Sequence, residues 1–295
     1  MTMKLTMVGS SGGIALDVSN VNRAGPSVLV DVDGELLLFD VGRSAHPNIL
    51  RAGYAPSSIE HVFVTHLHSD HGVGLPDLVL SQWIASGKNH WNVYGPEGTL
   101  HLIDGLFGDD GAYRADIVSR SEGPARRGLI EPRIGKPLGR PGFNVTEIAE
   151  PGVVCSGSDW EVRASFAPKH SQPLLASIAY RVESSQGSVV ITGDTGPHED
   201  VVEFARGCDV LVHDCTILAR TGFYTNRLTH TDPKSLGWVA AQAGVKTVIG
   251  THIALRYDHP ETLASYPGLV AESFSGQFLV AEDLLQLDVA TGDVL

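Results

Sequence analysis

Three histidines and an aspartate lie within six consecutive positions of this chain, at His66, His68, Asp70 and His71. They directly follow the run 59–64, whose composition is typical of a buried β-strand. Neutral imidazole and carboxylate are the usual ligands of zinc and similar divalent ions. Because four such side chains are costly to desolvate together without a cation, the fold must present this loop at a strand end as a metal site.

This loop predicts two metal ions rather than one. A single short loop cannot easily direct all four side chains at one ion, so we interpret them as two adjacent half-sites. A His-x-His-x-Asp-His pattern is expected by chance only about 0.002 times in a chain of this composition, so the signal is specific.

Further candidate ligands lie in the second half of the chain. His170, Asp194 and His252 each come shortly after a short apolar run of β-strand composition. Strand ends along one edge of a sheet are a rigid place to gather ligands from distant parts of a sequence.

Local signals predict several elements around these residues. Asp33-Gly34 predicts a tight hairpin turn, and the apolar spacing over 75–85 predicts a helix. Asp232-Pro233 predicts an N-cap and first helical residue, for a helix that ends at Gly244.

Residues 105–142 depart from this pattern of short strands. The segment is rich in Gly, Pro and Arg and has weak periodicity. We predict one domain over 1–295, with about 105–142 inserted as a lid or cap over the site. A surface excursion or an oligomer contact is an equal alternative.

Charge and cysteine content restrict the class of partner. The net charge is −13, which disfavours nucleic acid and anionic membranes because Lys and Arg hold phosphate groups. The three cysteines form no Cys-x-x-Cys pair, which favours a reducing, cytoplasmic location. No run approaches the roughly 20 apolar residues of a membrane span.

With these motifs the chain resembles the metallo-β-lactamase-fold hydrolases, in the branch that holds ribonuclease Z and the zinc arylsulfatase-like enzymes. The resemblance extends over nearly the whole chain and is carried by the segments 9–12, 38–42, 65–71, 94–99, 192–195 and 251–252. It implies an α/β fold, an αββα sandwich in which two mixed β-sheets lie face to face between helices. Residues 1–140 and 141–295 would supply about half each.

The resemblance also implies a role for each candidate ligand. The implied set is His66, His68 and His170 for the first ion, Asp70, His71 and His252 for the second, and Asp194 for both. Asp70 counts among the catalytic residues as well. We expect two divalent ions, zinc first and manganese or iron as alternatives, which would present a bridging hydroxide to an ester.

Two further residues resemble catalytic positions of the ribonuclease Z branch. There a His-Glu-Ala-Thr run supplies an acid that orients a catalytic histidine. This chain has Asp214 in place of that Glu, and His230 ahead of the helix that begins at Pro233. We predict that His230 donates a proton and that Asp214 orients it. In the alternative, Asp214 braces its loop and His230 caps the helix.

The expected substrate is a small ester, namely an aryl sulfate, a phosphodiester or a lactone. The tRNA-gripping arm of ribonuclease Z lies between the third His ligand and the bridging Asp, where this chain has room for only one hairpin. With the negative net charge, this predicts no nucleic-acid partner. The alternatives are a ribonuclease Z-type phosphodiesterase, a glyoxalase II-like thioesterase and, more remotely, a non-catalytic binding member. The resemblance further implies a homodimer.

Overall fold

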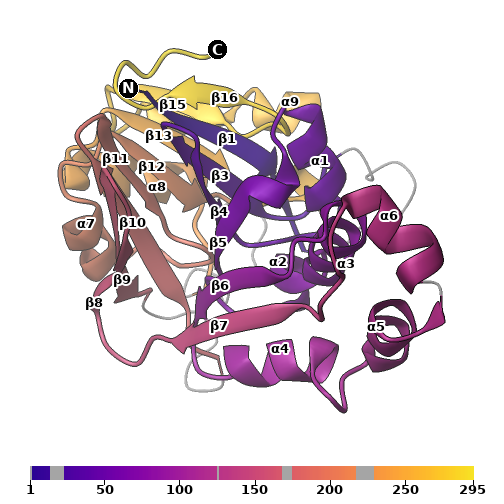
Figure 1. Ribbon diagram of the computed structural model, residues 1–295. Helices are drawn as coiled ribbons and strands as arrows, with labels where there is room; N and C mark the ends of the chain where they lie inside the picture. The colour runs from indigo at the N-terminus through magenta and orange to yellow at the C-terminus, as the bar shows by residue number, and fades with distance from the viewer. Residues whose placement is uncertain (1, 14–22, 125, 168–174, 217–228) are drawn as a thin grey trace.

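Two seven-stranded β-sheets lie face to face at the centre of the molecule, and helices cover their outer faces (Figure 1). The structure is a computed structural model, and it describes residues 2–13, 23–124, 126–167, 175–216 and 229–295. One apolar core fills the space between the sheets, and two others lie between each sheet and its helices. The predicted αββα sandwich is therefore confirmed.

The two sheets repeat the same pattern of strand directions. Counted from β16 in the first sheet and from β8 in the second, three antiparallel pairs are followed by three parallel pairs. The first sheet has the order β16 (Gln286–Asp288), β1 (Met3–Gly9), β3 (Ser27–Val32), β4 (Glu35–Phe39), β5 (Ile59–Phe63), β6 (His90–Gly95), β7 (Gly142–Glu147). The second has the order β15 (Gln277–Val280), β13 (Thr247–Thr251), β12 (Val210–Asp214), β11 (Gly187–Ile191), β10 (Ile178–Ser184), β9 (Trp160–Phe166), β8 (Gly152–Ser156).

The division between the halves differs slightly from the predicted one. β7 ends at Glu147 and still belongs to the first sheet, which β16 completes from the far end of the sequence. A short parallel pair, β2 (Ser11–Gly12) with β14 (Ile253–Ala254), also joins the two parts of the chain.

The helices follow the local signals of the sequence. The predicted helix over 75–85 is confirmed as α3, and the one behind Asp232 as α8, where the Asp232 carboxylate accepts hydrogen bonds from Lys234 N and Ser235 N. The helices are α1 (Ala45–Arg51), α2 (Ser69–Gly72), α3 (Leu75–Ser86), α4 (Thr99–Phe107), α5 (Arg114–Ser121), α6 (Glu131–Ile134), α7 (Glu199–Ala205), α8 (Pro233–Ala243), α9 (Pro260–Leu263) and α10 (Tyr266–Val270). Three shorter turns are η2 (Pro56–Ser58), η3 (Arg126–Ile130) and η6 (Leu255–Tyr257). In the part of the chain that the structure describes, every helix is too short or too polar to cross a bilayer.

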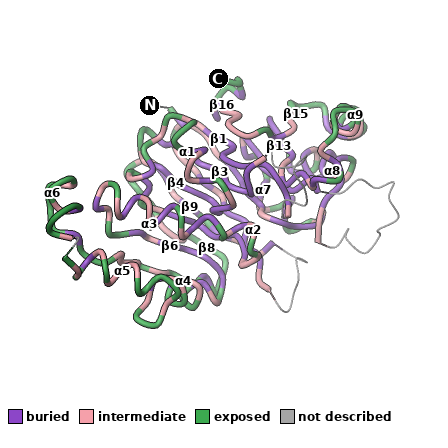
Figure 2. The backbone as a smooth tube through the Cα atoms, turned by 90° about the vertical axis from the view of Figure 1, so that its right-hand side faces the viewer, coloured by how far each residue is buried: buried purple, intermediate pink, exposed green. Residues whose placement is uncertain are grey.

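The segment 105–142 is more ordered than its weak periodicity suggests. It contains the end of α4, α5, the π-helical turn η3 and α6, and it connects β6 to β7. Ile117, Ile130 and Leu138 are buried and anchor it to the core outside the first sheet. We call residues 108–141 the helical lobe, which stands out from the body of the molecule (Figure 2). Its predicted role as a lid stays a prediction.

Packing between the sheets fixes the start of the histidine-rich loop. Phe63, the last residue of β5, stacks on Phe39 with ring centroids 4.7 Å apart. From the opposite sheet, the buried Tyr180 hydroxyl donates a hydrogen bond of 2.8 Å to Val64 O. The loop therefore begins from a rigid point held by both sheets.

The half-buried carboxylate of Asp209 links β11 to β12 and makes the stability of the fold depend on pH. It accepts hydrogen bonds from Ser188 N and Ser188 Oγ at 2.8 and 2.9 Å, and Lys246 Nζ lies 2.6 Å away. Burial alone would raise the pKa of Asp209, but these partners outweigh it and lower the pKa. The contribution is therefore present above the unfolded pKa of about 4 and is lost as pH falls through the lower folded pKa.

We predict that Asp209→Asn lowers the free energy of unfolding by roughly 1 kcal/mol at pH 7. The difference from the wild type should shrink as pH falls below about 4, because Asp209 then becomes neutral in both states. Urea unfolding at pH 7, 5 and 3.5 measures this. A difference that is constant over the whole range would contradict the ionic role of Asp209.

Candidate metal centre

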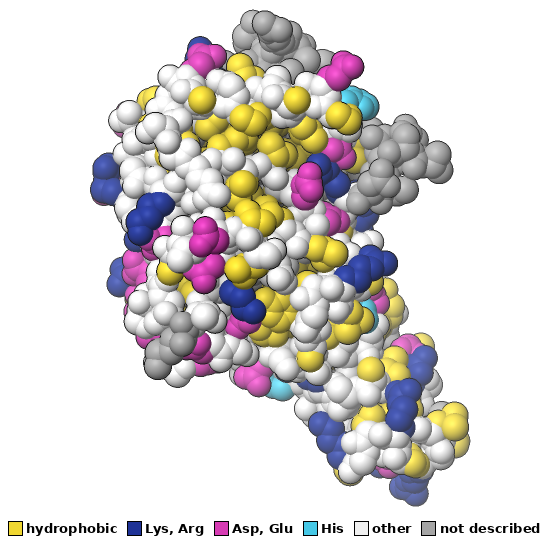
Figure 3. Space-filling model, turned by 90° about the horizontal axis from the view of Figure 1, so that it is seen from above, with side chains coloured by type: hydrophobic (Ala, Val, Ile, Leu, Met, Phe, Trp, Pro, Cys, Tyr) yellow, Lys and Arg dark blue, Asp and Glu magenta, His cyan; other side chains and the backbone are white. Residues whose placement is uncertain are grey.

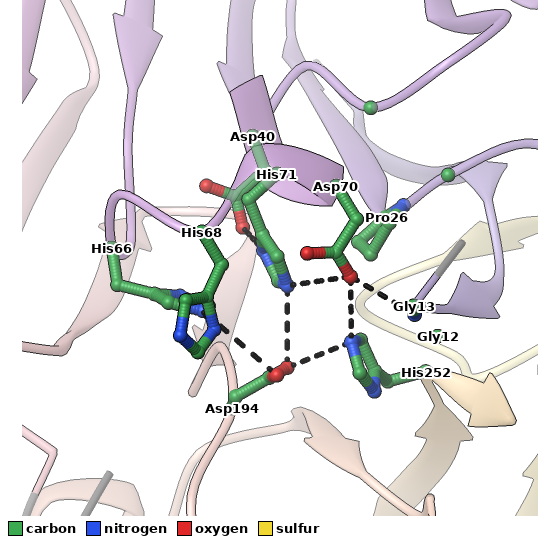
Figure 4. A network of polar contacts seen from close by, with 12 residues as sticks. Gly12, Gly13, Pro26, Asp40, His66, His68, Asp70, His71, Asp194 and His252 are labelled. Atoms are coloured by element: carbon green, nitrogen blue, oxygen red, sulfur yellow. Dashed lines mark hydrogen bonds and ion pairs between the residues drawn. The ribbon is translucent and has the colours of Figure 1, made fainter. Parts of the chain in front are cut away.

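The candidate ligands of the first half lie on one short stretch after β5. His66 and His68 are in the loop that follows the strand, and α2 places Asp70 and His71 on a single helical turn. From the second sheet, Asp194 follows β11 and His252 follows β13. Figure 4 shows these side chains pointing toward one another.

The carboxylate of Asp194 lies between the two groups of histidines. Its Oδ1 is 3.4 Å from His71 Nε2 and 3.2 Å from His252 Nε2, and its Oδ2 is 3.9 Å from His66 Nε2. Asp70 Oδ2 closes the other side, 3.4 Å from His252 Nε2. Asp194 thus lies within 4 Å of His66, His71 and His252, and its role as an acid shared by two ions stays a prediction.

His68 joins the same cluster. Its Nδ1 lies 2.9 Å from His66 Nε2. The structure therefore brings together six of the seven predicted ligands, namely His66, His68, Asp70, His71, Asp194 and His252. The seventh, His170, lies outside the described residues.

The donor atoms at the centre fit a divalent metal ion. His71 Nε2, Asp194 Oδ1 and His252 Nε2 are buried and make no hydrogen bond. Buried polar atoms without partners are costly, and metal coordination would satisfy all three. Three overlapping triads keep their donor atoms within 4.8 Å: His66, His71 and Asp194; Asp70, His71 and His252; Asp194, His230 and His252. Divalent metal binding is thus a property of this chain.

The electrostatics of His71 also indicate a cation. Burial alone would lower the pKa of this imidazole, yet the charges of Asp194 and Asp40 raise it well above its usual range. The surrounding carboxylates therefore demand positive charge at this point, which a proton or a metal ion can supply.

Asp40 is a site residue whose role the sequence did not reveal. Its Oδ2 lies 2.7 Å from His71 Nδ1 and accepts a 2.8 Å hydrogen bond from Thr65 Oγ1, which in turn lies 3.0 Å from His66 Nδ1. Because a carboxylate only accepts, His71 Nδ1 carries the proton and Nε2 keeps its lone pair for a metal. The signal available in the sequence was an acid directly after buried β4.

Thr216 holds the ring of His252 in the same way that Asp40 holds the ring of His71. Its Oγ1 lies 2.6 Å from His252 Nδ1 and donates to Asp214 Oδ1. Because the Thr216 hydroxyl hydrogen is used in that bond, His252 Nδ1–H donates to Thr216 Oγ1. His252 Nε2 then keeps its lone pair for a metal ion on the side of Asp194. Thr216 ends the run 213–216 that resembles the His-Glu-Ala-Thr run, but the sequence predicted no role for it.

We predict that Asp40→Ala weakens metal affinity by roughly 10- to 100-fold, because His71 and His66 lose the partner that fixes their orientation. Isothermal titration of the metal-free protein with zinc measures the change. Thr6→Ala, which removes a different buried polar side chain of the first sheet, should leave the affinity unchanged. Wild-type affinity in Asp40→Ala would contradict the positioning role.

Asp214 and His230 are in direct contact. His230 Nδ1 lies 2.8 Å from Asp214 Oδ2, even though Asp is one methylene shorter than the Glu of the related branch. Asp214 Oδ1 meanwhile accepts from Thr216 N at 2.8 Å, so the same carboxylate also braces its loop. Asp232, and not His230, is the N-cap of α8.

This contact controls the charge of His230. Burial alone would lower the pKa of the imidazole, but the negative charge of Asp214 and its hydrogen bond raise the pKa to about 9. His230 Nδ1 is 3.9 Å from Asp194 Oδ2, so the protonated ring stands beside the cluster.

Close packing and local strain accompany the site. A Cβ on Gly12 would lie 2.4 Å from His252 Nδ1, so only glycine lets the chain pass His252 at this point. Asp40 and His252 both have positive φ, 57° and 58°, in the left-handed region that costs roughly 1–3 kcal/mol for such residues. The surrounding contacts hold both residues in these conformations.

An apolar cavity opens beside the cluster. It has a volume of about 340 Å³, within the range of small-ligand pockets. Its lining includes His66 and His68 as well as Leu102, Leu106 and Tyr113. The helical lobe, which includes Tyr113, is therefore next to the candidate ligands.

Comparison with known proteins shows sequence relatives over almost the whole chain. Ribonuclease Z of Mycobacterium marinum is 28% identical over 308 aligned positions, which cover 97% of this chain and 99% of that protein. The predicted small-molecule substrate without a nucleic-acid partner is therefore wrong, because this relative is named for the cleavage of RNA. Net charge misled the prediction because it sums over the chain and hides how charges are distributed.

Solved structures share the fold. The metallo-β-lactamase fold protein YhfI from Bacillus subtilis superimposes with a TM-score of 0.73 at 17% identity, covering 98% of this chain and 100% of that one. Human tRNase Z, short form, superimposes with a TM-score of 0.69 at 18% identity, covering 97% and 99%.

The family is given by a match to a family model. The model described as "Beta-lactamase superfamily domain" matches residues 37–253, which include every candidate ligand. The chain therefore belongs to the beta-lactamase superfamily, and its similarity to a ribonuclease Z extends over 97% of its length.

Proposed function

We propose that this protein hydrolyses phosphodiester bonds of RNA with two divalent metal ions, zinc in the first instance. The observation that supports this most is the cluster of buried ligand atoms without hydrogen bonds on His71, Asp194 and His252, in a chain related over 97% of its length to a ribonuclease Z. The proposal replaces the expected small-ester substrate with the alternative of a ribonuclease Z-type phosphodiesterase.

The charges of the site support two ions. Asp40, Asp70, Asp194 and Asp214 together carry four negative charges, and Asp40, Asp194 and Asp214 are 4%, 2% and 0% exposed. With His230 protonated against Asp214 and the other histidines neutral, a single divalent cation leaves a net charge of −1 in this buried site, whereas two leave +1, which a bound hydroxide would balance. Uncompensated buried charge is strongly destabilising.

The proposed ligands are those expected from the sequence. The first ion would be held by His66, His68 and His170, the second by Asp70, His71 and His252, and both by Asp194. When bound, the ions would lower the pKa of water, polarise a phosphoryl oxygen and offset the negative charge of the transition state. Asp70 is held for this role by the N–H of Gly13, which donates to its Oδ2 at 2.9 Å.

His230 is the proposed proton donor. Cleavage of an RNA backbone releases an alkoxide, which needs a proton as the P–O bond breaks. Asp214 keeps His230 protonated at neutral pH and fixes the ring through Nδ1, and the proposed donor is Nε2–H. His230 is partly exposed, with 17% of its side chain accessible, as a group that meets substrate must be.

Cleavage assays on purified protein test this proposal. A precursor tRNA transcript, an unstructured RNA of equal length, bis(p-nitrophenyl) phosphate and a glutathione thioester are each offered with zinc, with manganese and with a chelator. We expect chelator-sensitive cleavage of RNA and of the aryl phosphodiester, with two metal ions per chain by elemental analysis. Turnover of the thioester alone, or cleavage that persists in chelator, would overturn the proposal.

A further inference from the structure

We propose that the helical lobe, residues 108–141, binds the phosphate backbone of the RNA substrate beside the metal centre. This inference rests on the proposed function and names the surface that would hold the partner. It concerns a segment that the candidate ligands do not use.

The cations of this acidic chain are unevenly distributed. The lobe holds 7 of the 21 Lys and Arg residues in 34 positions, namely Arg114, Arg120, Arg126, Arg127, Arg133, Lys136 and Arg140. It holds 5 of the 34 acidic residues, so its net charge is 7 − 5 = +2, while the rest of the chain carries 14 − 29 = −15. Figure 3 shows Lys and Arg side chains gathered on the projecting part at the lower right. A polyanion would therefore meet this surface with least repulsion.

The acids of the lobe are largely neutralised within it. Asp116 pairs with Arg120 and Glu131 with Arg126, each at 2.7 Å, and Arg140 lies 2.7 Å from both Asp109 and Glu122. Arg114, Arg127 and Lys136 are exposed and stand outside these ion pairs. Their charge is thus directed to solvent, where a phosphate group can reach it.

The lobe is continuous with the candidate metal centre. Leu106, just before the lobe, and Tyr113 within it line the same 340 Å³ cavity as His66 and His68. Arg114 directly follows Tyr113 and begins α5. A nucleotide next to the scissile bond can therefore occupy the cavity while the adjoining phosphates run over the lobe.

The lobe lies at a different point of the chain from the arm that ribonuclease Z has before its bridging Asp. Over the described residues 175–194, the chain forms only the β10–β11 hairpin before Asp194. The helical lobe is a projecting, cation-rich segment inserted at a different point, between β6 and β7. It offers the extended positive surface that the hairpin does not.

A pair of charge-matched variants tests the inference. Arg114→Gln, Arg127→Gln and Lys136→Gln are combined in one protein, and Arg163→Gln, Arg206→Gln and Lys234→Gln in the control, so that both lose three positive charges. Cleavage and binding of the precursor tRNA transcript are measured from 50 to 300 mM salt. We expect kcat/KM of the lobe variant to fall at least tenfold at low salt, through KM. The slope of log affinity against log salt should become shallower by about 0.7–0.9 per lost contact.

The control and a small substrate separate the possible outcomes. The control variant should keep the kcat/KM and the salt slope of the wild type within about twofold. Equal losses in both triple variants would overturn the role of the lobe and leave the proposed function standing. If the wild type cleaves bis(p-nitrophenyl) phosphate and no RNA, the proposed function itself fails. Circular dichroism of both variants confirms that a loss is not due to unfolding.

Discussion

Asp194→Asn is expected to lower kcat/KM for phosphodiester cleavage by at least about 10³-fold. The change removes one negative charge and one oxygen donor at the point where both histidine groups meet, with Asp194 Oδ1 3.2 Å from His252 Nε2 and 3.4 Å from His71 Nε2. Metal content should fall from two ions per chain toward one or none. Elemental analysis after gel filtration, with steady-state kinetics on the same sample, measures both quantities.

The loss should be specific to this carboxylate. Asp293→Asn, an identical change at an exposed position, should keep full activity and metal content. An Asp194→Asn protein that retains two ions and cleaves at the wild-type rate would refute the bridging role. Excess metal in the assay buffer distinguishes weakened binding, which it restores, from a lost catalytic geometry, which it does not.

His230→Ala is expected to lower kcat for RNA by about 10²- to 10⁴-fold, the usual contribution of a general acid. Its effect should depend on the leaving group. p-Nitrophenolate is stable without a proton, so cleavage of bis(p-nitrophenyl) phosphate should fall less than tenfold. Metal content should stay at the wild-type value, since Nδ1 of His230 is hydrogen-bonded to Asp214 and the proposed ligands do not include His230.

Asp214→Asn supplies the matched test of this contact. The amide cannot hold a positive charge on the ring, so the variant should lose activity on RNA in the same leaving-group-dependent way, though less than His230→Ala. His230 also belongs to one of the triads whose donor atoms lie within 4.8 Å. If His230→Ala loses metal, or loses both substrates equally, His230 is a ligand or a structural residue and not the acid.

The elements that the sequence predicted correctly are those with strong local signals. The four polar side chains at 66–71 follow a buried strand, and Asp232-Pro233 marks a helix start by capping chemistry alone. Asp194 and His252 were candidates because each follows a strand. Their approach to within 3.2 Å depends on two sheets meeting, which no local pattern contains.

The residues that escaped prediction act through partners distant in sequence. Asp40 matters because His71 and Thr65 lie against it, and Thr216 because His252 does. The helices of the lobe were missed because Gly and Pro interrupt their period, while Ile117 and Ile130 are buried by tertiary packing. The partner was misjudged because a net charge carries no information about position.

The pairing of β16 with β1 has a consequence for the order of events during synthesis. β1 spans Met3–Gly9 and pairs with Gln286–Asp288, more than 270 residues later. At about 5–20 residues per second, roughly 15–60 seconds separate the emergence of the two strands from the ribosome. Throughout that interval the first sheet has an open edge beside β1, with unpaired backbone groups able to recruit another strand. A nascent chain of this protein is therefore exposed to misassociation along β1 until Gln286–Asp288 pair with Lys4, Leu5 and Thr6.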